Sequence, residues 1–214
     1  MPQQNNKERF QMNFDRIIKE RRSIRKYQPK EIPQKLLEEV LEKALWAPSG
    51  MNKQNWELVV IRGKERDQLL KIVSKSKEHI LPHLKELFPE KIIEISLQVF
   101  KNLGGAPVVI LIYIPKDVIV YERDLDDQGR YHLEFNRFNW LLSAAALTQN
   151  LLLAAHSKGL GTCWMTGPKY VEKEINELLN ITDKELVSII PIGYPDQSPP
   201  APPRKEGVIK WVGF

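Results

Sequence analysis

The sequence predicts a single globular domain that contains both α-helices and β-strands. Of its 214 residues, 42% are hydrophobic and 28% are charged, a balance typical of a folded chain rather than a disordered one. Apolar residues recur at helical spacing in some stretches and form short β-branched runs in others. The length fits one large domain with a substantial core better than two small ones.

The helices are predicted from apolar residues that recur three and four positions apart. The clearest case is 33–46, where Pro33 suits the first turn of a helix. Pro82 and Pro89 are expected to divide the stretch 76–103. The expected helices cover 14–21, 33–46, 64–74, 92–103, 136–157 and 169–179.

The strands are predicted from runs rich in β-branched residues. The run 108–114 is apolar throughout, so both of its faces should be covered. The charged stretch 116–133 lacks clear periodicity and is expected to be a surface loop or lid. The expected strands cover 56–62, 108–114 and 186–192.

Two features of the chain point to a subunit interface. The helix 136–157 is apolar on most faces, and a domain of this size has little room to cover it all round. The proline-rich tail ends in the apolar run 208–214, which would be a liability if exposed and is expected to add to a sheet, the partner's being one possibility.

Composition argues against several classes of protein. The single cysteine, Cys163, excludes an internal disulfide and indicates a reducing compartment. No apolar run reaches the ~20 residues of a membrane span, and residues 1–13 do not resemble a secretory signal, so a cytoplasmic protein is expected. The net charge of +5 comes from scattered cations, so no nucleic-acid partner is expected. The pair His79 and His83 has no evident third ligand, and no metal site is expected.

Four segments carry groups suited to ligand binding. Residues 21–25 (RRSIR) offer forked guanidinium donors and a hydroxyl for phosphate oxygens. Residues 47–56 (APSGMNKQNW) offer open amides and side chains that suit a heterocycle edge. Residues 159–168 (GLGTCWMTGP) permit close approach to a flat ligand, and 199–205 (PPAPPRK) present a cation on a stiff tail. Each segment alone also fits a charged helix end, a connecting loop, a tight turn or a surface tail.

The order and spacing of these segments resemble the nitroreductase-like FMN flavoproteins, over residues 14–210. The resemblance implies an α+β fold of the nitroreductase-like type, with a mixed central β-sheet flanked by helices, in an intertwined homodimer. It implies that residues 14–214 form one FMN-binding domain, preceded by a flexible tail at 1–13. Residues 195–214 would then extend over the partner subunit, with FMN at the interface.

The resemblance also implies which residues bind the cofactor. Arg21, Arg22 and Ser23 would contact the FMN phosphate and ribityl chain, and Arg25 would lie near the pyrimidine edge of the ring. The remaining implied contacts are Pro48, Ser49, Gly50 and Asn52 in a loop from the other subunit, Thr166 and Gly167 beside flavin N5, and Arg204 at the phosphate.

The function implied is an FMN-dependent NAD(P)H oxidoreductase that reduces nitroaromatics, quinones or similar electron-poor acceptors by a ping-pong mechanism. The cofactor carries the chemistry, and no catalytic acid or base is required of the chain. The alternatives are a reductive dehalogenase or other specialised flavin reaction, and a non-catalytic flavin-binding sensor. The residues that could line the open face of the ring are Met51, Gln98, Phe100, Trp164 and the stretch 116–133.

Overall fold

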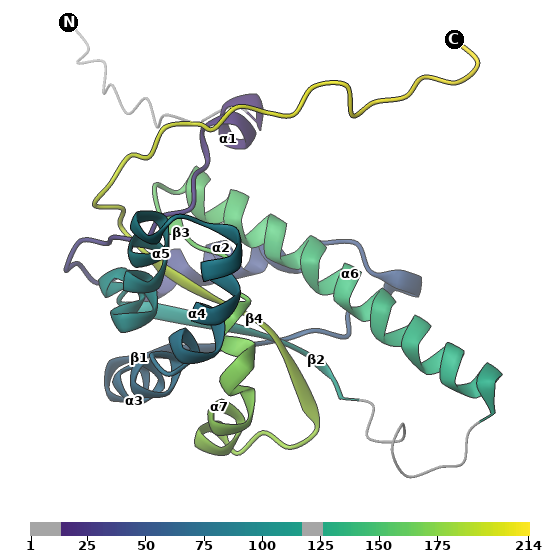
Figure 1. Cartoon of the computed structure of the whole chain (residues 1–214), viewed down its shortest axis with the longest axis horizontal. Helices are drawn as coiled ribbons and strands as arrows, with labels where there is room; N and C mark the ends of the chain where they lie inside the picture. Colours follow the sequence, from purple (N-terminus) through teal and green to yellow (C-terminus); the bar gives the residue numbers. More distant parts are fainter. Residues whose placement is uncertain (1–13, 117–125) are drawn as a thin grey trace, which may run out of the picture.

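The computed structural model describes residues 14–116 and 126–214, so the tail predicted at 1–13 lies outside the described residues (Figure 1). Within these ranges a four-stranded sheet in the order β1-β2-β4-β3 is covered by helices on both faces. The strands are β1 Glu57–Arg62, β2 Val108–Pro115, β3 Gly161–Thr162 and β4 Lys184–Gly193. The helices are α1 Phe14–Glu20, α2 Gln34–Leu45, α3 Gly63–Val73, α4 Ser76–Leu87, α5 Glu90–Asn102, α6 Asp127–Ser157 and α7 Glu172–Leu179, with 3₁₀ turns η1 Gly50–Asn52, η2 Leu103–Gly105 and η4 Gly167–Val171.

The sheet is antiparallel along all its strand pairs in the described part of the chain. The mixed character expected of it is confined to one parallel bridge, between Ser23 and Thr162. That bridge lies at the β3 edge, where the segment after α1 runs beside the sheet. The α+β class predicted from the sequence is confirmed.

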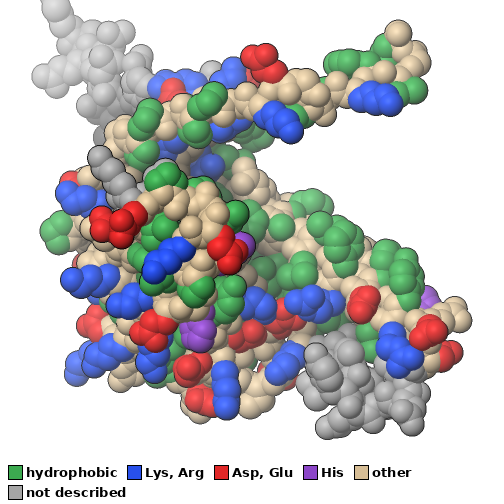
Figure 2. Space-filling view, viewed as in Figure 1, with side chains coloured by type: hydrophobic (Ala, Val, Ile, Leu, Met, Phe, Trp, Pro, Cys, Tyr) green, Lys and Arg blue, Asp and Glu red, His purple; other side chains and the backbone are tan. Residues whose placement is uncertain are grey.

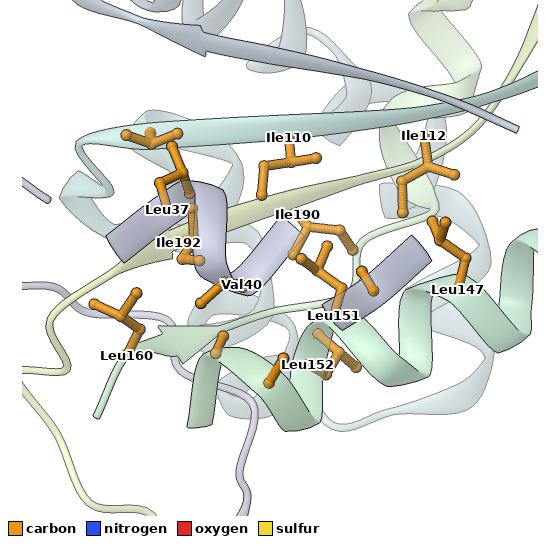
Figure 3. Packing of buried hydrophobic residues seen from close by; sticks show 14 of the residues in the cluster. Leu37, Val40, Ile110, Ile112, Leu147, Leu151, Leu152, Leu160, Ile190 and Ile192 are labelled. Carbon is orange, nitrogen blue, oxygen red and sulfur yellow. The ribbon is translucent and has the colours of Figure 1, made fainter. Parts of the chain in front are cut away.

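The central strand β2 has both faces buried, as its unbroken apolar run predicts. Its side chains alternate between the two faces of the sheet. Ile110 and Ile112 face α2 and α6 (Figure 3), whereas Leu111 and Tyr113 face α3, α5 and α7. All four side chains are fully buried. The helices therefore lie on both sides of a rigid sheet, and its β3 edge carries the candidate site.

Pro82 does not divide the helical region, contrary to the prediction. It lies inside α4, which continues to Leu87. An interior proline removes one backbone hydrogen bond, and the packing of α4 against α5 and η4 holds the helix together across the gap. The predicted break at Pro89 is confirmed, because α5 begins directly after it.

The predicted loop 116–133 is wrong in its second half. The helix α6 begins at Asp127, and the Asp126 carboxylate accepts a hydrogen bond of 2.8 Å from the Gly129 N–H as an N-cap. The first turns of α6 carry too many charges to show an apolar face, so hydrophobic periodicity could not reveal them. Residues 117–125 lie outside the described residues.

One side of the helix α6 is buried, and the opposite side is exposed although it carries large apolar side chains. Its inner side packs on the sheet, and 44% of its most apolar stretch is buried. Among the described helices, α6 is the one with the length and hydropathy of a membrane span. The core helix of a soluble protein can also reach these values. Its outer side carries four large exposed side chains three and four positions apart, visible in Figure 2 as hydrophobic patches along the helix. They are Tyr131, Phe135, Phe138 and Leu142, which are 63%, 49%, 55% and 53% exposed. We call this row the α6 stripe.

The C-terminal segment is an extended arm that runs away from the body (Figure 1). Residues 197–214 form no helix or strand, and Trp211 and Phe214 are 69% and 98% exposed. The expectation that the apolar run 208–214 joins a sheet is therefore not met within one protomer. The prolines between 199 and 203 stiffen the chain and carry the arm outward.

Candidate functional site

The segment 21–25 lies against the β3 edge of the sheet. The Ile24 N–H donates a 2.9 Å hydrogen bond to the Thr162 carbonyl. This approach requires a glycine at 161, because a Cβ there would lie 2.6 Å from Cγ1 of Ile24. The fold thereby brings the arginine-rich segment and the glycine-rich segment 159–168 together.

The start of the C-terminal arm is tied to the same place. The Tyr27 hydroxyl is buried and donates to the carbonyls of Ile24 and Pro191, at 2.7 and 3.1 Å. The Arg25 N–H donates to Oε1 of Gln197 at 3.3 Å. The arm therefore leaves the body directly beside residues 21–25.

Arg21, Arg22 and Arg204 form a cluster of positive charge at this edge. Burial, followed by the charges of Arg22 and Arg204, lowers the pKa of Arg21. A guanidinium stays protonated at neutral pH even so, because its ordinary pKa is above 12. The cluster therefore holds several positive charges close together, which suits a phosphate group.

Arg22 contributes its charge while both of its terminal nitrogens already donate to the backbone. Its two terminal nitrogens donate to the backbone carbonyls of Lys19 and Arg21, at the C-terminal end of α1. Such contacts satisfy helix-end carbonyls and favour a cation there. In the same cluster, Arg204 donates one hydrogen bond of 3.2 Å to the Pro202 carbonyl.

A mainly apolar pocket of about 330 Å³ lies on the other side of the segment 163–167, with Arg25 at its margin. The helices α4 and α5 close it. They approach so tightly that a Cβ on Gly167 would lie 2.5 Å from Cδ1 of Ile80 and 2.8 Å from Cζ of Phe100. The lining consists of Arg25, Ile80, His83, Leu84, Val99, Phe100, Cys163, Trp164, Met165, Thr166, Gly167 and Tyr170.

Part of the expected ring-face lining is found in this pocket. Phe100 and Trp164 line it. Met51 and Gln98 do not: Met51 is 90% exposed on η1, and Gln98 is exposed on α5. Sequence reasoning missed the contribution of α4, because nothing in its pattern shows which of its apolar residues face a neighbouring segment.

Cys163 lies between the cluster and the pocket but is not a nucleophile. It is 3% exposed. Burial raises the pKa of its thiol, although the charges of Arg25 and Arg21 oppose the shift. A buried, protonated thiol is unreactive. The influence of both arginines shows that cluster and pocket adjoin the same residue.

The loop 48–52 lies elsewhere in the protomer. The Gly50 N–H reaches Oγ of Ser143, in the middle of α6, at 3.5 Å. The arginine cluster instead adjoins His156 at the far end of that helix, and the helical rise between Ser143 and His156 is about 20 Å. One protomer therefore does not bring Pro48, Ser49, Gly50 and Asn52 to the arginines, whereas Arg21, Arg22, Ser23, Arg25, Thr166, Gly167 and Arg204 lie around one edge of the sheet.

Two further residues at this edge were not predicted. Glu20 and His156 line a second pocket of about 220 Å³ together with Arg22 and the first residues of the arm. The clue in the sequence is slight: His156 is a titratable residue in the last turn of α6, directly after a run of apolar residues.

A positive cluster suited to a phosphate, next to an apolar pocket bordered by open backbone groups, is the site of a protein that binds a flat, phosphate-bearing cofactor. The sequence profile of the nitroreductase family matches residues 18–194. The chain belongs to the nitroreductase family. This confirms the resemblance seen in the sequence, and with it the class of FMN-dependent oxidoreductases.

Individual relatives span nearly the whole chain. A candidate NADH dehydrogenase/NAD(P)H nitroreductase of Methanothermobacter thermautotrophicus is 30% identical, covering 88% of this chain and 80% of its own length. The iodotyrosine deiodinase of Thermotoga neapolitana is 28% identical, covering 96% of this chain and 100% of its own length. Among solved structures, a BluB-like flavoprotein from Clostridium difficile 630 has a TM-score of 0.73 at 25% identity, covering 94% and 99% of the two chains.

Proposed function

We propose that the chain is an FMN-dependent NAD(P)H oxidoreductase that reduces nitroaromatics, quinones or similar electron-poor small molecules in the cytoplasm. The observation that carries the proposal is that Cys163 borders the apolar pocket together with Arg25 and is also within reach of the charge of Arg21. A phosphate and a flat ring on one ligand need this pairing. Family membership and the NAD(P)H nitroreductase relatives support the same cofactor pair.

The residues present fit FMN. Arg21, Ser23 and Arg204 would hold the phosphate, with the charge of Arg22 behind them. Arg25 would lie at the pyrimidine edge of the ring, and the backbone of Thr166 and Gly167 would face N5. The cluster of like charges supports this assignment, since it lowers the pKa of Arg21 and a bound dianion would relieve it.

The site is completed by a second copy of the chain. Because the loop with Pro48, Ser49, Gly50 and Asn52 lies far from the arginines of its own protomer, we assign it to the partner's cofactor. The exposed α6 stripe and the arm at 195–214 supply apolar surface for such a homodimer.

Bound FMN supplies the transfer of electrons from NAD(P)H to the acceptor. The chain contributes position and charge. A cation at Arg25 would stabilise negative charge on a reduced ring, and the walls from α4 and α5 would favour flat molecules. With the ring in the pocket of about 330 Å³, the one open face of the ring would serve reductant and acceptor in turn, which would give ping-pong kinetics.

The test is the visible spectrum of the purified chain, before and after reconstitution with FMN, followed by stopped-flow reduction with NADH and with NADPH. We expect a yellow protein that either nicotinamide bleaches and that a nitroaromatic or a quinone reoxidises. A chain that takes up no FMN would overturn the proposal. A chain that binds FMN but is not reduced at a useful rate would instead be a flavin-binding sensor.

A reductive dehalogenase is the second candidate. The observation that favours it is the match to the Thermotoga deiodinase over that protein's full length. The distinguishing measurement is halide release from iodotyrosine by the reduced protein. No halide release, with quinone turnover intact, removes this candidate.

A further inference from the structure

His156 occupies an unusual place at the end of α6. Its ring lines the pocket of about 220 Å³ that also exposes Glu20 and Arg22. Its Nε2 atom is buried and has no hydrogen-bond partner among the described residues. A buried polar atom without a partner is destabilising, so it calls for an explanation in the function of the site.

The charged groups that act on His156 come from the end of α1. They are Glu20, Arg21 and Arg22. The arm lines the same pocket with Gln197 and Ser198, which carry no charge. The neighbouring cation, Lys158, directly follows α6 and forms an ion pair with Glu39.

We propose that His156 takes up a proton when the phosphate of FMN occupies the arginine cluster, so that cofactor binding is coupled to pH. The inference rests on the proposed function. It assigns His156 the role of a positioning residue, which reaches the phosphate through the electrostatic field of the cluster rather than by transferring a proton to substrate.

Without an anion, the site keeps the imidazole neutral. Burial lowers the pKa of His156, Glu20 opposes this shift, and Arg21 and Arg22 lower the pKa further. Glu20 is a weak counter-charge because its carboxylate also binds Arg16, with Nε of Arg16 at 3.0 Å. At neutral pH the free protein therefore holds a neutral histidine close to the guanidiniums of Arg21 and Arg22.

A bound phosphate opposes the part of this shift that comes from the arginines, whereas the effect of burial remains. It places up to two negative charges among Arg21, Arg22 and Arg204, which removes the repulsion that His156 experiences from the first two. The carbonyl end of α6 also favours an imidazolium in its last turn. One proton then passes from a hydronium ion or buffer acid in solvent to the free imidazole nitrogen, so that an N–H bond forms, the donor's bond to the proton breaks, and no other covalent bond changes.

The consequence follows from linkage. If the bound-state pKa of His156 is higher than its free-state pKa, FMN binding takes up protons at pH values between the two. The affinity must then rise as the pH falls through that interval, by up to about tenfold per pH unit. The FMN phosphate itself titrates near pH 6, so the effect of the histidine is the difference between wild type and a variant without it.

The experiment is an NMR titration of the histidine C2–H resonances in the full chain, from pH 5 to 8.5, with no ligand, with riboflavin and with FMN. His156→Gln assigns the resonance, and His132→Gln, at an exposed position on the same helix, is the matched control. We expect the His156 pKa to rise with FMN and to stay unchanged with riboflavin, which lacks the phosphate. If His156→Gln fails to fold, the resonance is assigned by elimination with variants of the other three histidines.

The same samples give FMN dissociation constants at pH 6 and pH 8. We expect the wild type to gain at least threefold more affinity on acidification than His156→Gln, and the His132→Gln protein to match the wild type. Equal pH dependence in all three, or an unmoved His156 resonance, overturns the inference while leaving the FMN proposal intact. Absence of FMN binding in the wild type overturns the proposed function instead.

Discussion

Arg21 and Arg204 lie near opposite ends of the chain, yet the charge of Arg204 lowers the pKa of Arg21. A guanidinium close to two others is destabilised by their repulsion, and a bound anion relieves that repulsion. The tertiary fold keeps these charges close together because the segment 21–25 is anchored to the sheet edge and the first residues of the arm bind to that segment. The strength of the repulsion is a property of single residues and can be tested one residue at a time.

Arg204→Ala should weaken FMN binding by about 1.5–3 kcal/mol, the contribution of a hydrogen bond to a charged group. The measurement is fluorescence quenching of FMN on titration with apoprotein. Riboflavin should bind the variant and the wild type equally, because it has no phosphate. Lys205→Ala is the matched control on the same arm, and an unchanged FMN dissociation constant for Arg204→Ala would refute the assignment.

Glu185 shows a different electrostatic arrangement, with a purely structural role. Burial alone would raise its pKa, but hydrogen bonds from Arg137 and Lys169, at 2.5–2.8 Å, and the charges of these residues lower the pKa to about 2. These bonds connect α6, η4 and β4.

Because the folded-state pKa of Glu185 lies below its ordinary value of 4.5, the stabilisation is complete above about pH 4.5 and is lost as the pH falls toward 2. Glu185→Gln should lower the free energy of unfolding by about 1–2 kcal/mol at pH 7, after allowance for solvent screening. Urea denaturation at pH 7 and pH 3 checks this: the gap from wild type should narrow at pH 3. Glu57→Gln, in a more exposed pair with Lys184, should cost less than about 1 kcal/mol.

Among the secondary-structure elements, the two-residue strand β3 positions the site. It pairs with β4 on one side and supports Ile24 on the other. The contact depends on the missing side chain of Gly161, as Cβ would lie 2.6–2.9 Å from three side-chain atoms of Ile24. The position of the arginines is thus determined by packing at one glycine.

Gly161→Ala should push the segment 21–25 off the sheet edge. We expect a loss of about 1–3 kcal/mol in stability, typical of overpacking, together with weaker FMN binding. Thermal unfolding and FMN titration measure the two effects. In the double variant Gly161→Ala/Ile24→Ala, two of the three clashing atoms are gone, and FMN affinity should partly recover. No difference between the single and the double variant would show that the clash is not the cause.

The whole molecule presents surfaces that one protomer leaves open. The α6 stripe and the arm expose large apolar side chains, and exposed patches of this kind mark interaction sites. The loop 48–52, held on α6 through Ser143, adjoins no cation of its own protomer's cluster. Both features follow if two chains form one site.

Light scattering should therefore give about twice the protomer mass of 24.9 kDa. Phe138→Glu places a charge in the middle of the α6 stripe and should shift the protein toward monomer, with a parallel loss of FMN, because burying an unpaired charge is costly. Glu134→Gln is the control on an exposed position of the same helix. A monomeric wild type that still binds FMN fully would contradict the two-chain site.

Much of the fold could be predicted from local pattern. The strand 108–114 and the helix 33–46 were confirmed because their apolar periodicity reflects burial directly. The break expected at Pro82 and the loop expected at 116–133 failed for the opposite reason. In α4 tertiary packing outweighed a local breaker, and in α6 an exposed helical start carried no apolar face to detect.

The sequence alone determined the class of the protein and predicted most of the groups that we assign to its site, because the RRSIR segment, the glycine-rich segment and the late arginine are local patterns that keep their order. The tertiary structure alone decided that these segments share one sheet edge, that Arg22 caps α1, and that Glu20 and His156 join the arginines. Local patterns specify which chemical groups a chain carries. Distances between remote segments depend on how helices and strands pack, and electrostatic coupling depends on those distances.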